Sequence, residues 1–474
     1  MPETLSVDIC VIGGGSGGLS AAAAAAAFGV SVVLVERGRM GGDCLNVGCV
    51  PSKALIAAAR HVRAIAEAEA FGITAGPVTV DFARVRAHIQ STIAAIAPND
   101  SVQRFTALGV RVIRAEARFV DRRTVVAGDI SIRARRFIIA TGSSPAIPAI
   151  PGLDTVDYLT NETLFDLKVL PAHLAVLGGG AVGLEMAQAF RLLGVEVTVI
   201  ELDRALAKED PELAAVVLKR LRADGVALHE SVTVTAVERD GSGLRLDGEG
   251  IDGPFSLQAS HLLLAAGRRA NLDSLDLAAG RIKRGPDGLR LGRGLRSSNR
   301  RVYAVGDAAG GPQFTHVAGY QAGIVLPQIL LRLPLRENRK ILPRVTFTDP
   351  EIAHVGLDAE TAQKRHRGCR ILRWTYADND RAQAERLTTG LIKVTADRKG
   401  RLLGIAIAGA GAGEMIGFWS LALAKKMTVR DIQNHVPAYP TLSEIGKRAA
   451  VSYYAPLARV RWIRSLIRFL ARFG

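Results

Sequence analysis

The pattern of apolar and polar positions begins with a short buried-type run, residues 7–12, that ends at a glycine-rich turn. The alanine-rich stretch that follows, to about Phe28, predicts a helix, and the apolar run 32–35 predicts a second strand that closes on Glu36. A strand, a helix and a second strand in this order form a βαβ unit of a parallel sheet. The beginning of the chain is therefore predicted to be α/β.

A second unit of the same kind spans residues 174–201. Gly13 lies 23 residues before Glu36, and Gly178 lies 23 residues before Glu201, so the two units are offset by 165 throughout. Glycines at such turns let the backbone approach a pyrophosphate at the helix N-terminus, and the acid accepts hydrogen bonds from a ribose hydroxyl. One such pattern is weak evidence, but two complete units with matched acids predict two dinucleotide-binding domains.

The rest of the chain contains further breaks and strands. A Pro/Gly stretch from residue 140 to 151 precedes the second unit, and the apolar runs 262–264 and 302–305 each end in a loop with glycine. From about Pro343 the pattern changes to alternating strands such as 391–394. We therefore predict a third, α+β domain with a mainly antiparallel sheet.

Composition limits the classes of function. The 474 residues are too many for one ordinary domain, and 48% hydrophobic with 22% charged residues excludes disorder, collagen-like repeats and low-complexity scaffolds. The net charge of +16 suggests nucleic acid or an anionic membrane, yet no nucleic-acid fold signature is present, so we expect no nucleic-acid partner. No secretory signal or spanning stretch is visible, and the four cysteines are too few to staple the chain, so we expect a cytoplasmic protein.

The most specific segment is Gly-Gly-Asp-Cys-Leu-Asn-Val-Gly-Cys-Val-Pro-Ser-Lys, residues 41–53. Cys44 and Cys49 stand five apart before a helix predicted beyond Ser52, and they can close a small disulfide if the helical turn is distorted. A helix N-terminus and a nearby cation lower a thiol pKa, so one sulfur can act as a nucleophile near neutral pH. The alternatives are a metal pair or two buried thiols, but no second Cys/His pair with ligand spacing lies nearby, so we expect no metal site.

These motifs resemble the flavin-dependent pyridine nucleotide–disulfide oxidoreductases, which include dihydrolipoamide dehydrogenase, glutathione reductase and mercuric reductase. The resemblance covers residues from about 5 to 452. It depends on the two glycine loops, the Cys44–Cys49 segment, Ala-Thr-Gly-Ser at 140–143 and Tyr-Ala-Val-Gly-Asp at 303–307. It implies FAD and NAD as cofactors, with NADP possible, and two Rossmann-like domains followed by a dimerisation domain. The implied divisions are 1–148 and 269–340 for FAD, 149–268 for NAD(P), 341–452 for dimerisation, and 453–474 as a separate tail.

The resemblance also implies roles for single residues. Cys49 would face the flavin as the charge-transfer thiol, and Cys44 would exchange with a disulfide or thiol substrate, either small or carried by a protein. Lys53 would lie by the flavin and pair with Glu185. The residues implied for FAD are Gly13, Gly15, Gly18, Glu36, Lys53, Ala117, Thr141, Gly142, Gly306 and Asp307. Those implied for the nicotinamide cofactor are Gly178, Gly180, Gly183, Glu201 and Gly267.

Glu201 bears on the choice between the two nicotinamides. A carboxylate at this strand end accepts from the 2′-hydroxyl of NAD and repels the 2′-phosphate of NADP. Arg204 and Lys208 follow soon after and soften that repulsion. We expect NAD, with NADP as the alternative.

The sequence departs from the family pattern near its end. Dihydrolipoamide dehydrogenases and glutathione reductases carry His-Pro-Thr followed by Glu, and here Tyr439 stands at the position of the His, while Glu444 remains. A phenol is a poor base at neutral pH, and His435 is the alternative group for the proton. Mercuric reductases are similar in carrying a Tyr, so a metal reductase is the alternative function, but their vicinal Cys pair is missing because no Cys follows residue 369.

The other two cysteines and a glycine-rich loop complete these expectations. Cys10 is predicted to be a buried packing residue. Cys369 lies in a basic stretch predicted to be solvated, and the alternative is a reactive thiol whose pKa the cations depress. Residues 409–416 resemble the family's dimer-domain loop and imply a homodimer with shared active sites.

The tail carries much of the positive charge. Seven basic residues and no acid follow Glu444, and apolar residues from Trp462 to Phe473 alternate with arginines at near-helical spacing. This pattern predicts a basic amphipathic helix, which would lie on an anionic membrane surface or a redox partner. The alternative is a helix packed on its own dimer.

Overall fold

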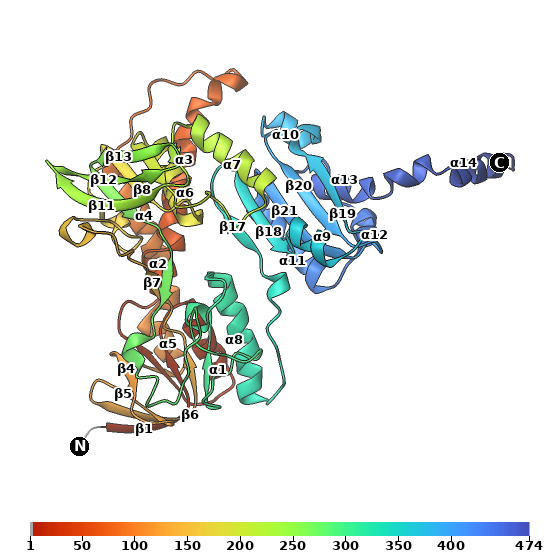
Figure 1. The fold of residues 1–474 in the computed structure, drawn as a ribbon. Coiled ribbons are helices and arrows are strands. Elements are labelled where there is room, and N and C mark those ends of the chain that lie inside the picture. Colours follow the sequence, from red (N-terminus) through yellow and green to blue (C-terminus); the bar gives the residue numbers. More distant parts are fainter. Residues whose placement is uncertain (1–2, 474) are drawn as a thin grey trace. The chain divides into compact units, whose positions relative to one another are not determined.

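The computed structural model describes residues 3–473 (Figure 1). It divides into two compact units. Unit 1 contains the described residues up to 179 together with 189–202 and 231–337. Unit 2 contains 180–188, 203–230 and the described residues from 338 onward. Both units mix helices with strands, which agrees with the predicted α/β class.

The core of unit 1 is a seven-stranded sheet. Its strands are β1 (Glu3–Ile12), β2 (Val32–Glu36), β3 (Val110–Arg114), β4 (Ala117–Phe119), β5 (Thr124–Ala127), β6 (Ile130–Ile139) and β16 (Val302–Ala304). The order is β3-β2-β1-β6-β5-β4, and β16 pairs with β6 in addition. β1, β2, β3, β6 and β16 pair in parallel, whereas β4 and β5 add an antiparallel edge. β2 is buried at all positions except its last, which is typical of a parallel strand covered on both faces.

Helices of unit 1 follow the glycine turns and the strands. They are α1 (Ser16–Ala27), α2 (Gly42–Asn46), α3 (Cys49–Ala66), α4 (Phe82–Ile96), α5 (Val102–Ala107) and α8 (Thr315–Leu330). α1 packs against α8, and α3 packs against α4. α1 is almost entirely alanine and glycine, and these small side chains allow its close approach to neighbouring elements.

Unit 1 also contains a second parallel sheet and an antiparallel meander. The elements are β8 (His173–Leu177), β9 (Glu196–Ile200), β14 (His261–Leu264), β11 (Thr233–Asp240), β12 (Gly243–Gly250), β13 (Gly253–Ala259), β7 (Ser143–Pro145) and β15 (Arg268–Ala270). β8 pairs in parallel with both β9 and β14. β11, β12 and β13 form the meander, and β7 pairs with β15. The second predicted βαβ unit is therefore confirmed, with α6 (Ala181–Leu192) as its helix.

Unit 2 has a five-stranded antiparallel sheet of order β17-β18-β21-β20-β19, which confirms the predicted change of pattern. Its strands are β17 (Arg344–Thr346), β18 (Glu351–Gly356), β19 (Arg370–Thr375), β20 (Leu391–Ala396) and β21 (Leu402–Gly409), and β10 (Ala227–His229) also lies in this unit. Its helices are α7 (Pro211–Ala223), α9 (Ala359–Arg365), α10 (Asp380–Ala384), α11 (Ala412–Ala424), α12 (Val429–Asn434), α13 (Glu444–Ser452) and α14 (Arg461–Leu470). α11 packs on β18 and β21, with Trp419 buried in this core.

Side-chain bonds explain why residues 180–188 and 203–230 lie in unit 2. Gln188 bonds the backbone of Asp349 in both directions, donating from Nε2 and accepting at Oε1, each at 2.7 Å. Lys393 is buried with its Nζ 2.6 Å from Asp210 Oδ1 and 2.5 Å from Glu212 Oε2. Because these bonds join α6 and α7 to the C-terminal sheet, the two units cut across the predicted domain boundaries, and the predicted division stays a prediction.

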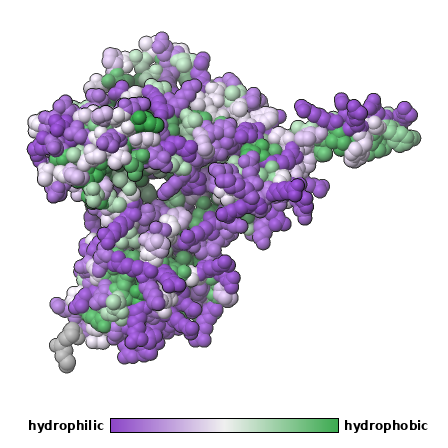
Figure 2. Space-filling model, in the orientation of Figure 1, coloured by the Kyte–Doolittle hydropathy of each residue, from purple (hydrophilic) through white to green (hydrophobic). Residues whose placement is uncertain are grey.

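The apolar side chains of the last helix, α14, are exposed to solvent. Trp462 is 66% exposed and Phe473, just beyond the helix, is 75% exposed. Figure 2 shows a purple, hydrophilic side and a green, hydrophobic side along this segment. The predicted amphipathic helix is confirmed. Among residues 3–473, no helix is long and apolar enough to cross a membrane.

Candidate active site

The first glycine turn is built so closely that side chains are excluded. Gly13 has a φ of +112°, and a Cβ at this position would lie 2.2 Å from the carbonyl oxygen of Ala140. A Cβ on Gly18 would lie 1.9 Å from the carbonyl oxygen of Gly13. α1 then begins after Gly15 with no side-chain cap, so the N–H groups of its first turn face the turn without a side-chain acceptor. Such a helix start is suited to hold a phosphate.

The second turn repeats this construction. Gly178 has a φ of +119°, and a Cβ there would lie 2.5 Å from the carbonyl oxygen of Ala265. In each βαβ unit, the acidic residue at the end of the second strand accepts a hydrogen bond from the backbone of the glycine turn. Glu36 accepts the N–H groups of Gly14 and Gly38, each at 2.5 Å, and Glu201 accepts the N–H of Gly179 at 2.6 Å. The sequence repeat is thus a repeat in three dimensions, and it places each carboxylate beside its glycines.

The two motif cysteines lie together at the start of α3. All four cysteines are free thiols, with Cys44 half-buried in α2 and Cys49 exposed as the first residue of α3. The helix therefore begins at Cys49, before the predicted start beyond Ser52. The two thiols hydrogen-bond each other, and Cys49 Sγ lies 3.4 Å from Thr315 Oγ1, at the first residue of α8.

Their mutual bond separates the two thiols in acidity. The hydrogen bond from Cys44, followed by that from Thr315 and the positive charge of Lys53, lowers the pKa of Cys49 to about 6 despite partial desolvation. The same bond, together with burial, raises the pKa of Cys44 far above its ordinary value. At neutral pH the pair therefore holds one proton on Cys44, while Cys49 is a thiolate.

This difference predicts the pH dependence of alkylation. Only the thiolate reacts, so the rate of Cys49 alkylation by iodoacetamide should rise with pH through a midpoint near 6 and not near the ordinary thiol value of about 8.5. Cys44→Ala removes the largest cause and should move the midpoint upward. Peptide mapping of the labelled, reduced protein measures both midpoints, and a Cys49 midpoint above pH 8 in the unchanged protein would contradict the assignment.

A polar network surrounds the predicted FAD residue Asp307. Ser143 Oγ donates to Asp307 Oδ2 at 2.5 Å and itself accepts from Arg268 Nε at 2.8 Å. Arg268 Nη2 lies 3.1 Å from Asp43 Oδ1, and Asn161 donates to that same oxygen at 2.9 Å. Burial raises the pKa of Asp307.

Four members of this network are absent from the sequence-based site. Three of them stand directly beside a predicted site residue: Asp43 in Gly-Gly-Asp-Cys, Ser143 in Ala-Thr-Gly-Ser and Arg268 in Ala-Ala-Gly-Arg. A polar side chain at such a position is a signal from which these three could have been predicted. Asn161 stands in a loop without such a motif. Thr315 was missed for the same reason, because it meets Cys49 across 266 positions of sequence.

The remaining predicted FAD residues lie around the ends of these strands. Gly306 has a φ of +66° and donates its N–H to buried Gln321 at 2.7 Å. Gly142 also has a positive φ, with open space where a Cβ would stand, and Ala117 is buried in β4. The hydroxyl oxygen of Thr141 is buried with no partner among the described residues. On the nicotinamide side, Gly180 faces open space, Gly183 lies in α6, and Gly267 has a φ of +122°.

The predicted residues of unit 2 have protein partners of their own. Glu185 is buried and accepts the N–H of Phe347 at 2.8 Å. Tyr439 is exposed and donates to Asp380 Oδ2 at 2.7 Å, and this carboxylate raises the pKa of the phenol. Glu444 forms an ion pair with Arg448 at 2.8 Å, and His435 stacks on Phe418. The predicted pairing of Lys53 with Glu185 would join the two units and stays a prediction.

The two cysteines outside the motif differ from each other. Cys10 is fully buried in β1, as predicted, and burial raises its pKa to about 12. For Cys369 the alternative of a cation-activated thiol is wrong, because partial burial raises its pKa and the guanidinium of Arg370 lies over the Tyr453 ring. Among residues 3–473, no group of three or more His, Cys, Asp or Glu side chains is arranged to hold a metal ion.

The chain matches two family models over most of its length. The pyridine nucleotide-disulphide oxidoreductase model matches residues 7–322, and the dimerisation domain of the same family matches residues 342–450. The chain belongs to the pyridine nucleotide-disulphide oxidoreductase family. It is therefore an FAD-dependent oxidoreductase that uses NAD(P)H, and its dimerisation domain supports a homodimer.

Relatives with different activities match almost the whole chain. A mercuric reductase of Streptomyces lividans is 36% identical over 461 residues, covering 96% of this chain and 97% of the relative. A dihydrolipoyl dehydrogenase of Geobacillus stearothermophilus is 33% identical over 455 residues, covering 94% and 96%. The crystal structure of LpdA from Mycobacterium tuberculosis aligns with a TM-score of 0.86 at 27% identity, covering 94% and 100%. Together they support a disulfide oxidoreductase and leave its substrate open.

The described residues fit the family's cofactors. The uncapped start of α1 leaves N–H groups for a pyrophosphate, and the buried Thr141 hydroxyl has no protein partner. At Gly142 and Gly180 the backbone is bare, with open space where a side chain would stand. A bound dinucleotide would satisfy the unpartnered groups and fill the open space at these positions.

Proposed function

We propose that this protein is a homodimeric, dihydrolipoamide-dehydrogenase-like NAD(P)H:disulfide oxidoreductase whose redox-active disulfide forms between Cys44 and Cys49. The observation that carries the proposal is the hydrogen-bonded thiol pair at the start of α3, in which the pKa of Cys49 is lowered and the pKa of Cys44 is raised. A pair that stores two electrons and divides its protons in this way has the properties needed for thiol–disulfide exchange.

The residues divide the work as follows. When bound, FAD and the nicotinamide supply two-electron transfer. Reduction breaks the Cys44–Cys49 bond, leaving the proton on Cys44 and the negative charge on Cys49, where Lys53 and Thr315 stabilise it. Cys44 loses its proton to the first leaving half of the substrate as its sulfur attacks the substrate disulfide, so Cys44 reacts as a thiolate, a mixed disulfide forms and the first thiol leaves. The Cys49 thiolate attacks the resulting mixed disulfide at Cys44, restores the protein disulfide and releases the second half of the substrate as a thiolate, which takes a proton from water.

The glycine turns divide the cofactors between them. For FAD we assign the turn of Gly13, Gly15 and Gly18 with Glu36, supported by Asp307 and its hydrogen-bond network. Lys53, Ala117, Thr141, Gly142 and Gly306 complete that set. For the nicotinamide we assign Gly178, Gly180, Gly183, Glu201 and Gly267, with NAD preferred because Glu201 repels a 2′-phosphate.

Tyr439 is assigned as a hydrogen-bonding group and not as the proton acceptor. Its phenol already donates to Asp380, which raises its pKa, so it remains protonated at neutral pH. Tyr439→Phe should therefore change the kcat for disulfide reduction by less than about 3-fold and leave its pH profile in place. Steady-state rates between pH 6 and 9 test this, and a loss of about a hundredfold would identify Tyr439 as an essential proton carrier.

A substrate panel tests the proposed function. The purified holoenzyme is assayed with NADH and NADPH against lipoamide, glutathione disulfide and Hg(II). We expect at least one disulfide to be turned over, with NADH several-fold better than NADPH in kcat/KM. NAD(P)H oxidation with Hg(II) and with neither disulfide would instead favour the metal-reductase alternative, which the present observations do not favour.

For the tail we propose a peripheral contact with an anionic membrane surface. α14 exposes Trp462, Phe469 and Leu470 along with its arginines, and arginine with large apolar side chains is the combination that binds the interface of anionic bilayers. The homodimer would then be held at the membrane while its active site remains in water.

Liposome flotation is the test of the tail. The full chain should float with vesicles containing anionic phosphatidylserine and stay behind with neutral phosphatidylcholine, whereas Trp462→Ser/Phe469→Ser should lose at least about tenfold of the binding. Equal flotation of both forms would contradict the proposed membrane contact of α14. A variant that turns monomeric would favour the alternative, a helix packed on its own dimer.

A further inference from the structure

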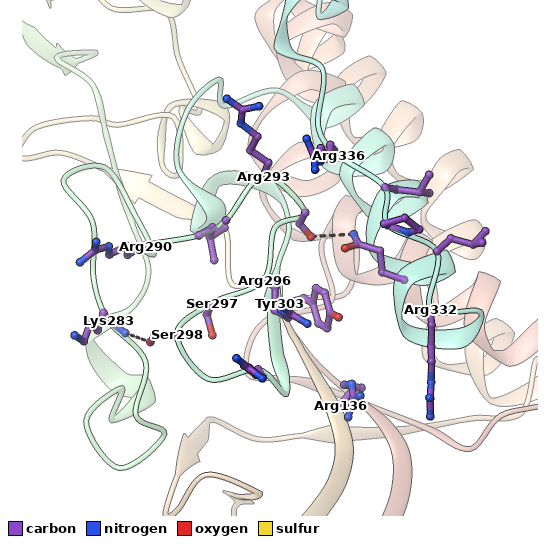
Figure 3. A pocket seen from close by; sticks show the side chains of 18 residues that line it. Arg136, Lys283, Arg290, Arg293, Arg296, Ser297, Ser298, Tyr303, Arg332 and Arg336 are labelled. Atoms are coloured by element: carbon purple, nitrogen blue, oxygen red, sulfur yellow. Dashed lines mark hydrogen bonds between the residues drawn. The ribbon is translucent and has the colours of Figure 1, made fainter.

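A wide cavity in unit 1 is lined by many positive charges and no negative one. Its volume is about 1400 Å³, and it lies among the loops before β16 and after α8 (Figure 3). Eighteen residues line it, and none of them is acidic. Eight of them are cations: Arg136, Lys283, Arg290, Arg293, Arg296, Arg300, Arg332 and Arg336.

These cations are not neutralised by the protein. Among the described residues, no carboxylate oxygen lies within 4.0 Å of a side-chain nitrogen of any of these eight cations. The Nε of Arg136 is buried without a hydrogen-bond partner. Beside the cavity, burial and then the repulsion of Arg123, Arg136 and two further arginines lower the pKa of Arg301. So many uncompensated guanidinium groups create a strongly positive potential, which favours an anionic partner.

The cavity is separate from the predicted cofactor residues. Arg296 and Arg300 precede β16, and Arg296 forms a β-bridge with Tyr303 in that strand. Gly306 and Asp307 follow the carboxyl end of the same strand, the end at which doubly wound sheets bind their ligands. The charge is therefore not explained by FAD phosphates.

The lining also distinguishes between kinds of anion. Leu333 and Leu335 are 46% and 39% exposed, and with Pro334 they form an apolar edge of the cavity. A phosphate backbone has no apolar groups that could cover this edge. Tyr303 is the one aromatic residue among the eighteen, and it is buried, so nucleic-acid bases find no stacking surface. Guanidinium groups pair with carboxylates and phosphates alike through two parallel hydrogen bonds, so the apolar edge, and not the charge, favours an acidic peptide.

We propose that this cavity docks an acidic peptide segment of a partner protein that also carries apolar side chains. Glutamate and aspartate side chains pair with the arginines, while apolar side chains cover Leu333, Pro334 and Leu335. The same basic lining on a second copy of this chain would be repelled, because none of the lining residues is acidic. The site gives the reductase a place to hold a protein partner, and its contribution depends strongly on salt.

Fluorescence anisotropy with the FAD-loaded full chain is the test. The probes are a labelled peptide of alternating Glu and Leu, a Glu/Ser peptide of equal charge and length, and a single-stranded RNA of equal charge. We expect the Glu/Leu peptide to bind most tightly, the Glu/Ser peptide several-fold less tightly, and both affinities to fall at least about tenfold between 50 and 200 mM salt.

Charge reversal locates the binding. Arg293→Glu/Arg300→Glu should weaken Glu/Leu binding at least about tenfold. The control, Lys399→Glu/Lys425→Glu, makes the same change in net charge at exposed positions of unit 2 and should have no effect. Circular dichroism and FAD content check that each variant is folded, and Arg293→Gln/Arg300→Gln serves if the reversal fails to fold. Equal loss in both pairs, no binding by the unchanged protein, or tighter binding of the RNA than of the Glu/Leu peptide would each overturn the proposal.

Discussion

Replacing Cys49 with serine is expected to lower NAD(P)H-dependent disulfide reduction by at least about a thousandfold. The variant retains the FAD turn and the nicotinamide turn but no longer has a sulfur that can close the bond with Cys44. Serine, with its far higher pKa, does not form the anion that the Cys44 bond, Thr315 and Lys53 stabilise at position 49. Electrons would then reach the flavin but would have no disulfide to enter.

The measurement separates the two halves of the reaction. Reduction of ferricyanide by NADH should stay within about 3-fold of the unchanged enzyme, because a one-electron acceptor takes electrons from the flavin without the protein disulfide. Cys369→Ser is the matched control, since this thiol is neither acidic nor part of the motif, and it should retain full disulfide reduction. Disulfide turnover at the usual rate in the Cys49→Ser variant would disprove the assigned redox pair.

Cys44→Ser should fail in a different way. Disulfide turnover should fall to the same extent, but Cys49 should remain reactive toward iodoacetamide, because a serine hydroxyl at position 44 can still donate to its sulfur. The two variants therefore assign the thiolate and the exchanging thiol independently of the substrate.

The second large effect is expected at Gly18. An alanine Cβ there would lie 1.9 Å from the carbonyl oxygen of Gly13, and this neighbour is backbone at the turn, so it cannot rotate away. Gly18→Ala should push α1 away from the turn and raise the Kd for FAD by about a hundredfold. This factor corresponds to about 3 kcal/mol of binding free energy, which is within the usual cost of overpacking. FAD retained per protomer after gel filtration and the FAD Kd of the apoprotein measure the effect.

Gly76→Ala is the control for that substitution. No heavy atom lies within 4 Å of a Cβ at Gly76, so the same chemical change meets open space. This variant should bind FAD normally. Wild-type FAD content and thermal stability in Gly18→Ala would contradict the close-packed turn.

Much of the fold was predictable because it depends on local rules. The spacing from Gly13 to Glu36 and its repetition at Gly178 and Glu201 predicted two βαβ units, and both form. The alternating pattern after residue 343 predicted an antiparallel sheet, which is present. Element boundaries were less accurate. α3 begins at Cys49 and not beyond Ser52, because a helix can start on a residue that its own composition does not mark.

The interactions between distant segments were not predictable in this way. Asp43 in α2, Ser143 in β7, Arg268 in β15 and Asn161 in a loop are far apart in sequence and meet only in the folded chain. The arginine cavity gathers residue 136 with two later segments, 283–300 and 332–336, so the sequence reveals a basic chain but not a basic hollow. Gln188 and Lys393 likewise tie helices of the second βαβ region to the C-terminal sheet.

By itself, the sequence determined the chemistry this protein carries: two dinucleotide turns, a pair of thiols five residues apart and an amphipathic basic tail. Such features are set by residue types at fixed short spacings, so they can be recognised without the fold. Only the tertiary structure decided which thiol is the acid. The pKa of Cys49 falls because Cys44, Thr315 and Lys53 converge on its sulfur, and one of these partners is 266 positions away. Acidity depends on distances in space, and those distances are created by the packing of α8 and α1 beside the motif.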